Sequence, residues 1–376
     1  MDAASESRRA RRAIAWTALA SLVAALALEY SRPDLLIVGP ITVDIVDNDT
    51  PTGGSVSYAA VAARALGARG CVVTVSGPQR AQQLDVFDGH ALTVLPSNVT
   101  LTFAHTYRWW GSHRKLQVTA NPQVTLTRSQ VPLWCRRARA VLLGPLTLHD
   151  VDAASFTRAD GLLGRLLYPP SSQIVGLMAQ GFQRALGPEG EVMPLEEPSQ
   201  QLLAGLGPGV TLFLSDVETD AWPVGAVQAV AARTARMLVT LGDKGAHEYE
   251  PGAAAPRHIV PIKINAVDTN GAGDTFAAAY TIAQLLGDPD PGAAATWAAS
   301  RAVLQPQSCK PHCAPALVPG GRAAPITRAD RLRLSAAALL RRAGLPAAAR
   351  ALAARDGLRL AVDTALGALG VRAQSF

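Results

Sequence analysis

The sequence has few of the residues that mark a disulfide-stapled, metal-bound or membrane-spanning protein. Four cysteines in 376 residues do not make a disulfide framework. Cys309 and Cys313 flank a short stretch containing His312, but no second Cys/His cluster exists to complete a tetrahedral metal site. We therefore expect a loop there and no metal. The apolar run from Ile14 to Leu28 is shorter than the roughly 20 residues that a transmembrane helix needs.

A large block of positive charge is also missing from the centre of the chain. The net charge is +6, but residues 1–33 hold five arginines against three acidic residues, and residues 331–376 hold eight against two. The middle, 34–330, therefore carries −2, which predicts no nucleic-acid partner. Hydrophobic residues make up 49% and charged residues 17%, as in a globular protein, and length allows one large domain or two modest ones.

The two ends differ in composition from the middle. Arginines 8, 9, 11 and 12 precede the apolar run, and three interpretations stay open: a cleaved targeting peptide, a short membrane anchor, or an extra helix. The compartment is accordingly unknown, cytoplasmic or organellar depending on the fate of residues 1–33. The alternation of strands and helices ends at about residue 305, and a Pro- and Gly-containing loop is predicted at 305–325. The Ala/Arg-rich tail 331–376 predicts two or three helices.

Residues 34–330 read as alternating strands and helices. Leu35–Gly39 predicts a buried strand, Ser57–Leu66 a helix closed by Gly67, and residues 71–75 the next strand. Further strands are predicted at 140–144, 172–178, 210–214 and 237–242, with a helix at 226–235. This order is typical of a parallel α/β sheet. Residues 91–127 alternate apolar and polar side chains without helix signals, which predicts antiparallel strands that form a small lid.

The run Asp268–Asp274, with a Gly-Ala-Gly turn before an apolar helix, carries the most chemistry. Amide groups at a helix start attract anions, and glycine lets an anion approach the backbone. An acid at such a site fits a base that deprotonates a hydroxyl group attacking a bound phosphate. The alternative is that Asp simply caps the helix.

Three segments of 34–330 together resemble the ribokinase/PfkB family of carbohydrate kinases. The run Asp268–Asp274 is similar to the family's C-terminal signature, and residues 239–245 are similar to the strand and turn beside its nucleotide. Val38–Asp44 followed by Gly53 and Gly54 resembles its sugar-binding signature. The segment 176–182 resembles an outlying branch near myo-inositol kinase-like proteins. The resemblance implies a three-layer α/β/α sandwich with a central, mainly parallel sheet and a small β lid.

The resemblance also implies a role for each matching residue. Asp274 would be the general base, and the amides of Gly271, Ala272 and Gly273 would form the anion hole. The nucleotide side would comprise Thr240, Gly242, Gly245, Ser215 and Glu218, and Glu218 would hold magnesium through water. The acceptor side would comprise Asp44, Gly53, Gly54 and Tyr58. Asp268 is expected to fix the turn.

Three positions depart from the family pattern. Ser215 stands where the family has Asn, and Thr42 and Tyr58 stand where its sugar-binding signature often has Asn, so the acceptor pocket is expected to differ. The resemblance implies an ATP- and Mg²⁺-dependent kinase for a sugar or polyol hydroxyl, acting as a monomer or homodimer without a membrane partner. The alternatives are a nucleoside kinase of the same fold and a non-catalytic scaffold or regulatory protein.

Overall fold

A computed structural model describes residues 3–46, 50–107, 114–157, 173–306 and 325–353. The chain divides into two compact units. The larger unit comprises residues 33–285 and 289–325, and the smaller unit comprises residues 1–32, 286–288 and 326–376. The Cys309–Cys313 stretch, most of the predicted 305–325 loop and the tail beyond 353 lie outside the described residues.

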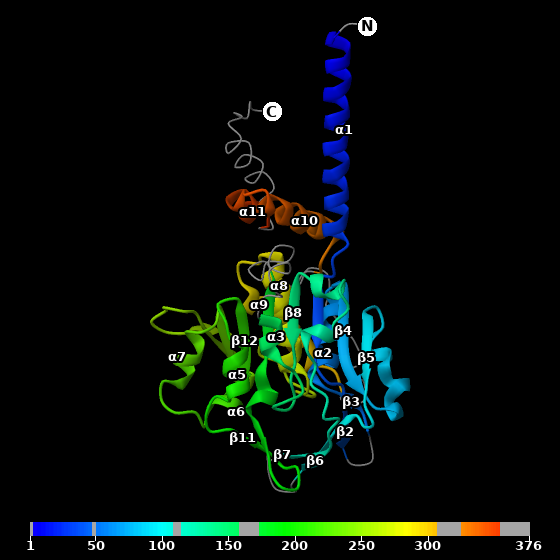
Figure 1. Ribbon diagram of the computed structural model, residues 1–376. Helices are drawn as coiled ribbons and strands as arrows, with labels where there is room; N and C mark the ends of the chain where they lie inside the picture. Colours follow the sequence, from blue (N-terminus) through cyan, green and yellow to red (C-terminus); the bar gives the residue numbers. More distant parts are fainter. Residues whose placement is uncertain (1–2, 47–49, 108–113, 158–172, 307–324, 354–376) are drawn as a thin grey trace. The chain divides into compact units, whose positions relative to one another are not determined.

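A nine-stranded sheet forms the centre of the larger unit (Figure 1). Its order is β15-β14-β13-β12-β9-β8-β1-β4-β5, and all neighbouring pairs from β13 to β5 are parallel, while β14 and β15 are antiparallel. The predicted mainly parallel sheet is confirmed. The strands span Leu35–Val38 (β1), Gly70–Ser76 (β4), Ala91–Pro96 (β5), Ala140–Leu143 (β8), Ile174–Met178 (β9), Val210–Ser215 (β12), Arg236–Thr240 (β13), Ala246–Tyr249 (β14) and Arg257–Ile259 (β15).

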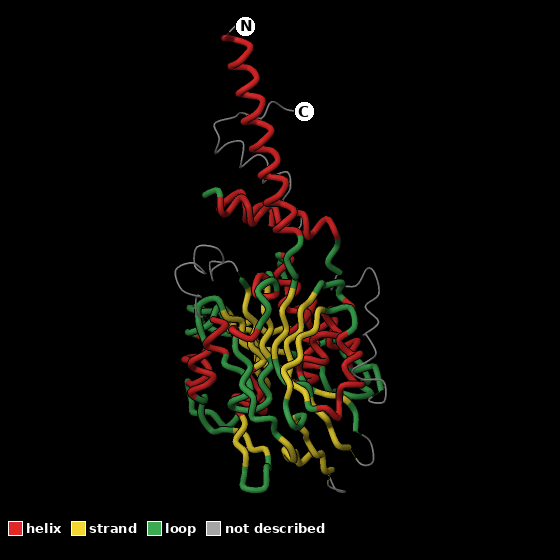
Figure 2. The backbone as a smooth tube through the Cα atoms, turned by 45° about the vertical axis from the view of Figure 1, so that its right-hand side comes forward, coloured by secondary structure: helices red, strands yellow, loops and turns green. Residues whose placement is uncertain are grey.

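Helices cover both faces of this sheet, as Figure 2 shows. On one face, the helix residues Phe156, Leu202 and Val230 pack into one buried cluster with side chains of the sheet strands. On the other face, the Phe213 ring meets Tyr280 edge to face at 5.6 Å. The strands are apolar on both faces because both are covered. The helices are Ser55–Ala65 (α2), Ala153–Thr157 (α3), Gln200–Gly205 (α5), Asp216–Thr219 (α6), Ala226–Ala231 (α7), Ala272–Leu286 (α8) and Pro291–Ala302 (α9).

A second, four-stranded sheet of order β3-β2-β6-β7 lies at one end of the larger unit, lowest in Figure 1. Its strands are Thr42–Val46 (β2), Thr52–Gly53 (β3), Leu101–Tyr107 (β6) and Arg114–Ala120 (β7). The β6–β7 pair is antiparallel, as predicted, whereas β2 and β6 are parallel.

The prediction of antiparallel lid strands throughout 91–127 is wrong at both ends of that range. Residues 91–96 form β5, whose Leu92 pairs in parallel with Val72 in the main sheet. β5 is an edge strand with partly exposed side chains, so it alternates in polarity as a lid strand would. Near the other end, Leu126 makes only an isolated parallel bridge to Val151.

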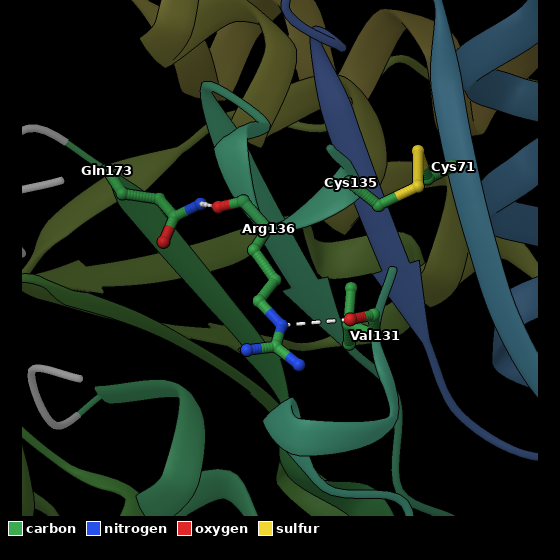
Figure 3. The surroundings of a disulfide bond; sticks show 5 residues. All are labelled: Cys71, Val131, Cys135, Arg136 and Gln173. Atoms are coloured by element: carbon green, nitrogen blue, oxygen red, sulfur yellow. Dashed lines mark hydrogen bonds between the residues drawn. A yellow bond between two sulfur atoms is a disulfide. The ribbon is translucent and has the colours of Figure 1, made fainter. Parts of the chain in front are cut away.

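One disulfide bond lies in the larger unit; the sequence analysis predicted no disulfide framework, and this single bond was not foreseen. Cys71 of β4 bonds Cys135, which begins the short 3₁₀ helix η3 (Cys135–Arg137), and both are almost fully buried. Figure 3 shows this bond beside Arg136, which donates from Nε to the Val131 carbonyl at 2.8 Å. The two cysteines are 64 residues apart in sequence, a separation that no local pattern connects.

The smaller unit consists of helices. The apolar N-terminal run lies in α1 (Ala3–Tyr30), and the tail forms α10 (Arg328–Arg342) and α11 (Pro346–Ala353). Buried Glu29 of α1 accepts a hydrogen bond from Arg32 and forms an ion pair with Arg342 of α10, each at 2.9 Å. Within the described ranges, no helix has both the length and the apolar character needed to cross a membrane.

Candidate active site

The carboxyl ends of β12 and β13 bring together the predicted nucleotide-side residues. Ser215 and Thr240 are directly paired across the two strands. The chain then turns at Gly242 (φ 61°) and Gly245 (φ 92°), both in the left-handed region that favours glycine. A Cβ at Gly245 would lie 2.1 Å from the Ile259 carbonyl oxygen, whereas one at Gly242 would meet nothing within 4 Å. Gly245 is therefore fixed by the fold, and Gly242 leaves open space above it.

Ser215 and Glu218 form the capping box of α6. The Ser215 amide donates to Glu218 Oε2 at 2.6 Å, and the Ser215 hydroxyl hydrogen-bonds the same oxygen. This explains how serine serves at the position where the resemblance led us to expect asparagine: its short side chain still fixes the glutamate. Among the described residues no group of three or more His, Cys, Asp or Glu side chains gathers as a metal site. A single partly buried carboxylate fits the way proteins hold Mg²⁺ mainly through waters and substrate phosphates.

The run Asp268–Asp274 folds into a tight turn that opens α8. Asp268 Oδ1 accepts from the Asn270 amide at 3.0 Å, so Asp268 fixes the turn as predicted. Gly271 has φ 74°, and a Cβ there would lie 2.0 Å from the Tyr58 ring. Tyr58 of α2 thus packs directly on the predicted anion hole.

The three predicted anion-hole residues differ in their surroundings. The Ala272 amide donates to the Thr269 carbonyl at 3.2 Å, which reduces its availability to a ligand. Gly273 is exposed, and the space where its Cβ would lie is open. The helix start therefore offers an accessible backbone surface at Gly273 and a tightly packed one at Gly271.

Asp274 lies in the first turn of α8, half-buried, so that its carboxyl group is partly removed from water. This desolvation raises the pKa of Asp274 to about 6; a hydrogen bond from Ser55 and the charge of Arg184 oppose the rise, while Glu218 and Asp44 add to it. Four side chains from distant parts of the chain therefore act on one carboxyl group. A carboxyl group with a pKa near neutrality is suited to proton transfer.

Asp44 belongs to a polar cluster on the small sheet. Its Oδ1 accepts from the Thr42 hydroxyl at 3.0 Å and lies 3.8 Å from Nε2 of His105 on β6. A Cβ at Gly53 would lie 2.2 Å from Asp44 Oδ2, so Gly53 makes room for this carboxylate. Gly54 (φ 93°) is the N-cap of α2, beside the Pro40 carbonyl.

Sequence reasoning assigned no role to Ser55, Gln180 and Arg184, which also belong to this region. Gln180 Nε2 donates to Ser55 Oγ at 2.6 Å, and Arg184 donates to Gln180 Oε1 at 2.9 Å. Gln180 stands inside the 176–182 segment that supported the resemblance, and Ser55 follows the Gly53-Gly54 pair. Their positions next to these motifs were the only hint in the sequence. A contact between residues 125 positions apart cannot be predicted from local sequence patterns.

The predicted site residues therefore meet in pairs and around one carboxyl group. Asp44 lies against Gly53, Tyr58 lies against Gly271, and Ser215 holds Glu218, while the charges of Asp44 and Glu218 both raise the pKa of Asp274. The arrangement combines a helix start, a carboxyl group of raised pKa and a second carboxylate set among hydrogen-bonding groups. Such a set is able to bind an anion, take up a proton and hold hydroxyl groups.

Comparison with known structures defines the class of this fold. A pyrophosphate-dependent kinase in the ribokinase family, solved with a pyrophosphate analog and myo-inositol, matches with a TM-score of 0.54 at 16% identity, over 78% of this chain and 98% of that one. A probable sugar kinase from Rhizobium etli CFN 42 matches at 0.53 and 17%, over 84% and 99%. The adenosine kinase of Sinorhizobium meliloti matches at 0.51 and 14%, over 73% and 95%. The predicted ribokinase-like three-layer α/β/α fold is confirmed.

The sequence itself matches the profile of the pfkB family carbohydrate kinases over residues 218–315. That segment contains Glu218, the Gly242–Gly245 turn and the whole Asp268–Asp274 run, so the resemblance to the ribokinase/PfkB family is confirmed there. The N-terminal signature around Asp44 lies outside the matched segment. No curated protein matches the sequence.

Proposed function

We propose that this protein is an ATP- and Mg²⁺-dependent kinase that transfers the γ-phosphoryl group to a hydroxyl group of a sugar or polyol. The observation that carries the proposal is Asp274, a carboxyl group whose pKa is raised to about 6 in the first turn of the helix that the Gly-Ala-Gly turn opens. The pfkB profile match over this same segment supports it.

In the proposed reaction, the Asp274 carboxylate takes the proton of the acceptor hydroxyl group. The acceptor oxygen forms a bond to the γ-phosphorus as the bond from that phosphorus to the β-phosphate's bridging oxygen breaks, which releases ADP and leaves the proton on Asp274. The backbone at Gly271 and Gly273, at the positive end of α8, stabilises charge on the transferred group. Glu218 would hold Mg²⁺ through water, and the ion would neutralise phosphate charge.

Asp44 is proposed to hold acceptor hydroxyl groups. A carboxylate accepts such hydrogen bonds well, and Thr42 and His105 fix its orientation. Gly54 and Tyr58 complete the acceptor side of the proposal, where Tyr58 supplies a ring face against Gly271. The substitutions at Thr42 and Tyr58 favour an acceptor other than ribose.

The segment that follows β15 supports a nucleotide as the donor rather than pyrophosphate. Val260 and Val267 are 71% and 63% exposed, and Ile262 and Ile264 between them are also exposed. These apolar side chains follow the Gly242–Gly245 turn and precede the Asp268 turn. A nucleotide base covers exposed apolar surface, which pyrophosphate lacks the apolar atoms to do.

The experiment is an acceptor panel of inositol, fructose, ribose and adenosine, with ATP and pyrophosphate as donors, run on the wild type and Asp274→Asn. We expect transfer from ATP to a sugar or polyol, with kcat in the variant reduced at least about 10³-fold because the base is lost. Wild-type kcat/KM should fall about tenfold per pH unit below pH 6, where Asp274 becomes protonated.

The melting temperature of Asp274→Asn shows whether a loss of activity comes from misfolding. A folded-state pKa raised above the ordinary value means that ionising Asp274 destabilises the native state, so stability is lost as pH rises from about 4 to about 6. Asp274→Asn should therefore melt at a temperature equal to or above that of the wild type at pH 7. A variant with wild-type kcat would show that Asp274 is not the base. Preference for adenosine would identify a nucleoside kinase, and no transfer from either donor would favour a scaffold.

A further inference from the structure

A buried carboxylate away from the candidate active site joins two strands and a helix. Glu248 of β14 is 1% exposed, and its Oε1 accepts from Arg236 Nη1 of β13 and from the Tyr280 hydroxyl of α8, each at 2.5 Å. Its Oε2 accepts from Arg257 of β15 through Nε, at 2.8 Å, and through Nη2. Both carboxylate oxygens are therefore occupied by donors from other elements.

The chemistry of this cluster fixes the direction of its hydrogen bonds. Burial acts to raise the pKa of Glu248, but hydrogen bonds from Tyr280, Arg257 and Arg236 outweigh burial and lower it. An ionised carboxylate only accepts, so the Tyr280 hydroxyl must donate to it. The Tyr280 ring is fully buried and stacks on Phe276 with centroids 6.2 Å apart, so both the ring and the hydroxyl of Tyr280 hold α8 in one orientation.

Two of the donors to Glu248 lie on either side of the segment 260–271. Arg257 lies in β15, just before this segment, and Tyr280 lies in α8, just after it. Tyr280 follows Asp274 by six residues on the same helix, which is about 9 Å along the helix axis. The segment carries the exposed apolar side chains that are proposed to cover a nucleotide base, and it leads into the helix start that is proposed to meet phosphate. One carboxylate therefore ties both ends of the segment.

A second path, through α9, holds the middle of the same segment. Arg257 Nη1 donates to Asp290 Oδ1 at 3.0 Å, and Asp290 is the N-cap of α9. At the other end of α9, the carbonyl of the C-cap residue Val303 accepts from the amides of Val267 and Asp268 at 2.8 and 3.1 Å. The arginine that binds Glu248 thus also fixes the helix whose far end holds the Asp268 turn.

We propose that Glu248 is a positioning residue, which acts through Tyr280 and Arg257 to fix the segment 260–271 relative to the start of α8 and so sets the geometry of the donor site. The inference rests on the proposed function for the identity of the donor, a nucleotide. Glu248 lies outside the segments 239–245 and 268–274, to which roles were assigned. Because Tyr280 and Arg257 bind different oxygens of Glu248, either donor can be removed while the other remains.

The test is hydrogen–deuterium exchange of the full-length protein followed by mass spectrometry, with nucleotide affinity as the second readout. Tyr280→Phe keeps the ring and removes the hydroxyl group, so the fold should persist. We expect residues 260–273 to exchange about fivefold faster, the change expected for the loss of one hydrogen bond, while β1 and β4 exchange as in the wild type. The Kd for ADP with Mg²⁺, measured by calorimetry, should also rise about fivefold. In turnover, KM for ATP should rise more than KM for the acceptor.

Glu250→Gln is the matched control. Glu250 pairs with Arg236 at 2.8 Å, but its carboxylate is 51% exposed, so the variant should leave both the exchange rates and the Kd unchanged. Arg257→Met removes the other donor and should change the same two readouts as Tyr280→Phe. If the segment is held only when both of its ends are tied, the double variant Tyr280→Phe/Arg257→Met should change them by less than the two single effects combined.

Unchanged exchange of residues 260–273 in Tyr280→Phe would overturn the inference. Faster exchange spread evenly over the main sheet would also overturn it, because Glu248 would then only stabilise the fold. Faster exchange at 260–273 with an unchanged Kd for ADP would remove its role in the donor site. If the wild type binds no nucleotide, the proposed function fails in its donor, and the exchange rates still decide whether Glu248 holds the segment. If the wild type transfers phosphate from ATP and neither readout changes in the variants, the inference fails alone.

Discussion

Gly271 and Gly273 are two residues apart, but the structure requires glycine only at the first of them. Gly271 has φ 74° and touches the Tyr58 ring, whereas a Cβ at Gly273 would enter open space. Gly271 is therefore required by the fold itself. Gly273 lies in the first turn of α8, where alanine is a better helix former than glycine, so only a bound ligand would require glycine there.

We expect Gly271→Ala to lower stability and Gly273→Ala to preserve it. The left-handed conformation costs a non-glycine residue about 1–2 kcal/mol, and the contact with Tyr58 adds to that cost. Gly273→Ala should keep or slightly raise the melting temperature but reduce phosphoryl transfer, because its Cβ would occupy space proposed for phosphate. Thermal unfolding and turnover of both variants provide the comparison.

Tyr58 supplies the control for the Gly271 substitution. In Gly271→Ala/Tyr58→Ala the ring is gone, so the double variant should be less destabilised than the sum of the two single variants. Additive losses would mean that the ring does not press on this turn.

At the scale of elements, the Cys71–Cys135 bond ties β4 to the segment that leads into β8. It closes a loop of 64 residues that contains β5 and the β6–β7 hairpin. These strands connect elements far apart in the chain, so the bond restricts the unfolded state over a long stretch. A bond so deeply buried is placed to stabilise the fold.

Replacing both cysteines by alanine should lower the free energy of unfolding by about 4 kcal/mol, the loop-entropy value for a closed loop of this length. Urea unfolding of the oxidised wild type and of Cys71→Ala/Cys135→Ala measures the difference. Wild-type protein unfolded with a reductant should approach the double variant. Equal stability of the two oxidised proteins, or peptide mapping that finds both thiols free, would contradict the bond.

At the scale of the whole molecule, the core of the larger unit draws on that unit alone. One buried cluster on the main sheet runs from Leu36 to Val239, and Tyr280, which packs on Phe213 at the other face, also belongs to the larger unit. Glu29, Arg32 and Arg342 instead join helices within the smaller unit. Each unit therefore has its own packing.

We expect the chain 33–325 to fold without the terminal segments, because no residue of its main core is removed. Circular dichroism should show a single cooperative transition, and any kinase activity of the full chain should persist within a few-fold. Deleting residues 1–32 alone is the control, since it strips α10 of its partner Glu29 and leaves part of the smaller unit unpaired. An unfolded or aggregating 33–325 would show that the two units depend on each other.

The sequence alone determined the features that depend on neighbouring residues. Buried strands such as Leu35–Val38, the helix after Gly54 and the Asp268 turn follow from local apolar runs and turn chemistry, and each is present. The same local rules misplaced Leu92, because an edge strand of the main sheet and a lid strand alternate in polarity in the same way.

Only the tertiary structure decided which distant residues meet. The disulfide joins positions 64 apart, and Gln180 reaches Ser55 across 125. Sequence spacing carries no signal for such contacts, because they arise when parallel strands align their carboxyl ends and small residues such as Gly53 and Gly271 let side chains approach. The sequence therefore predicted Asp274 as the base, while the fold placed Ser55, Arg184, Glu218 and Asp44 where they shift its pKa.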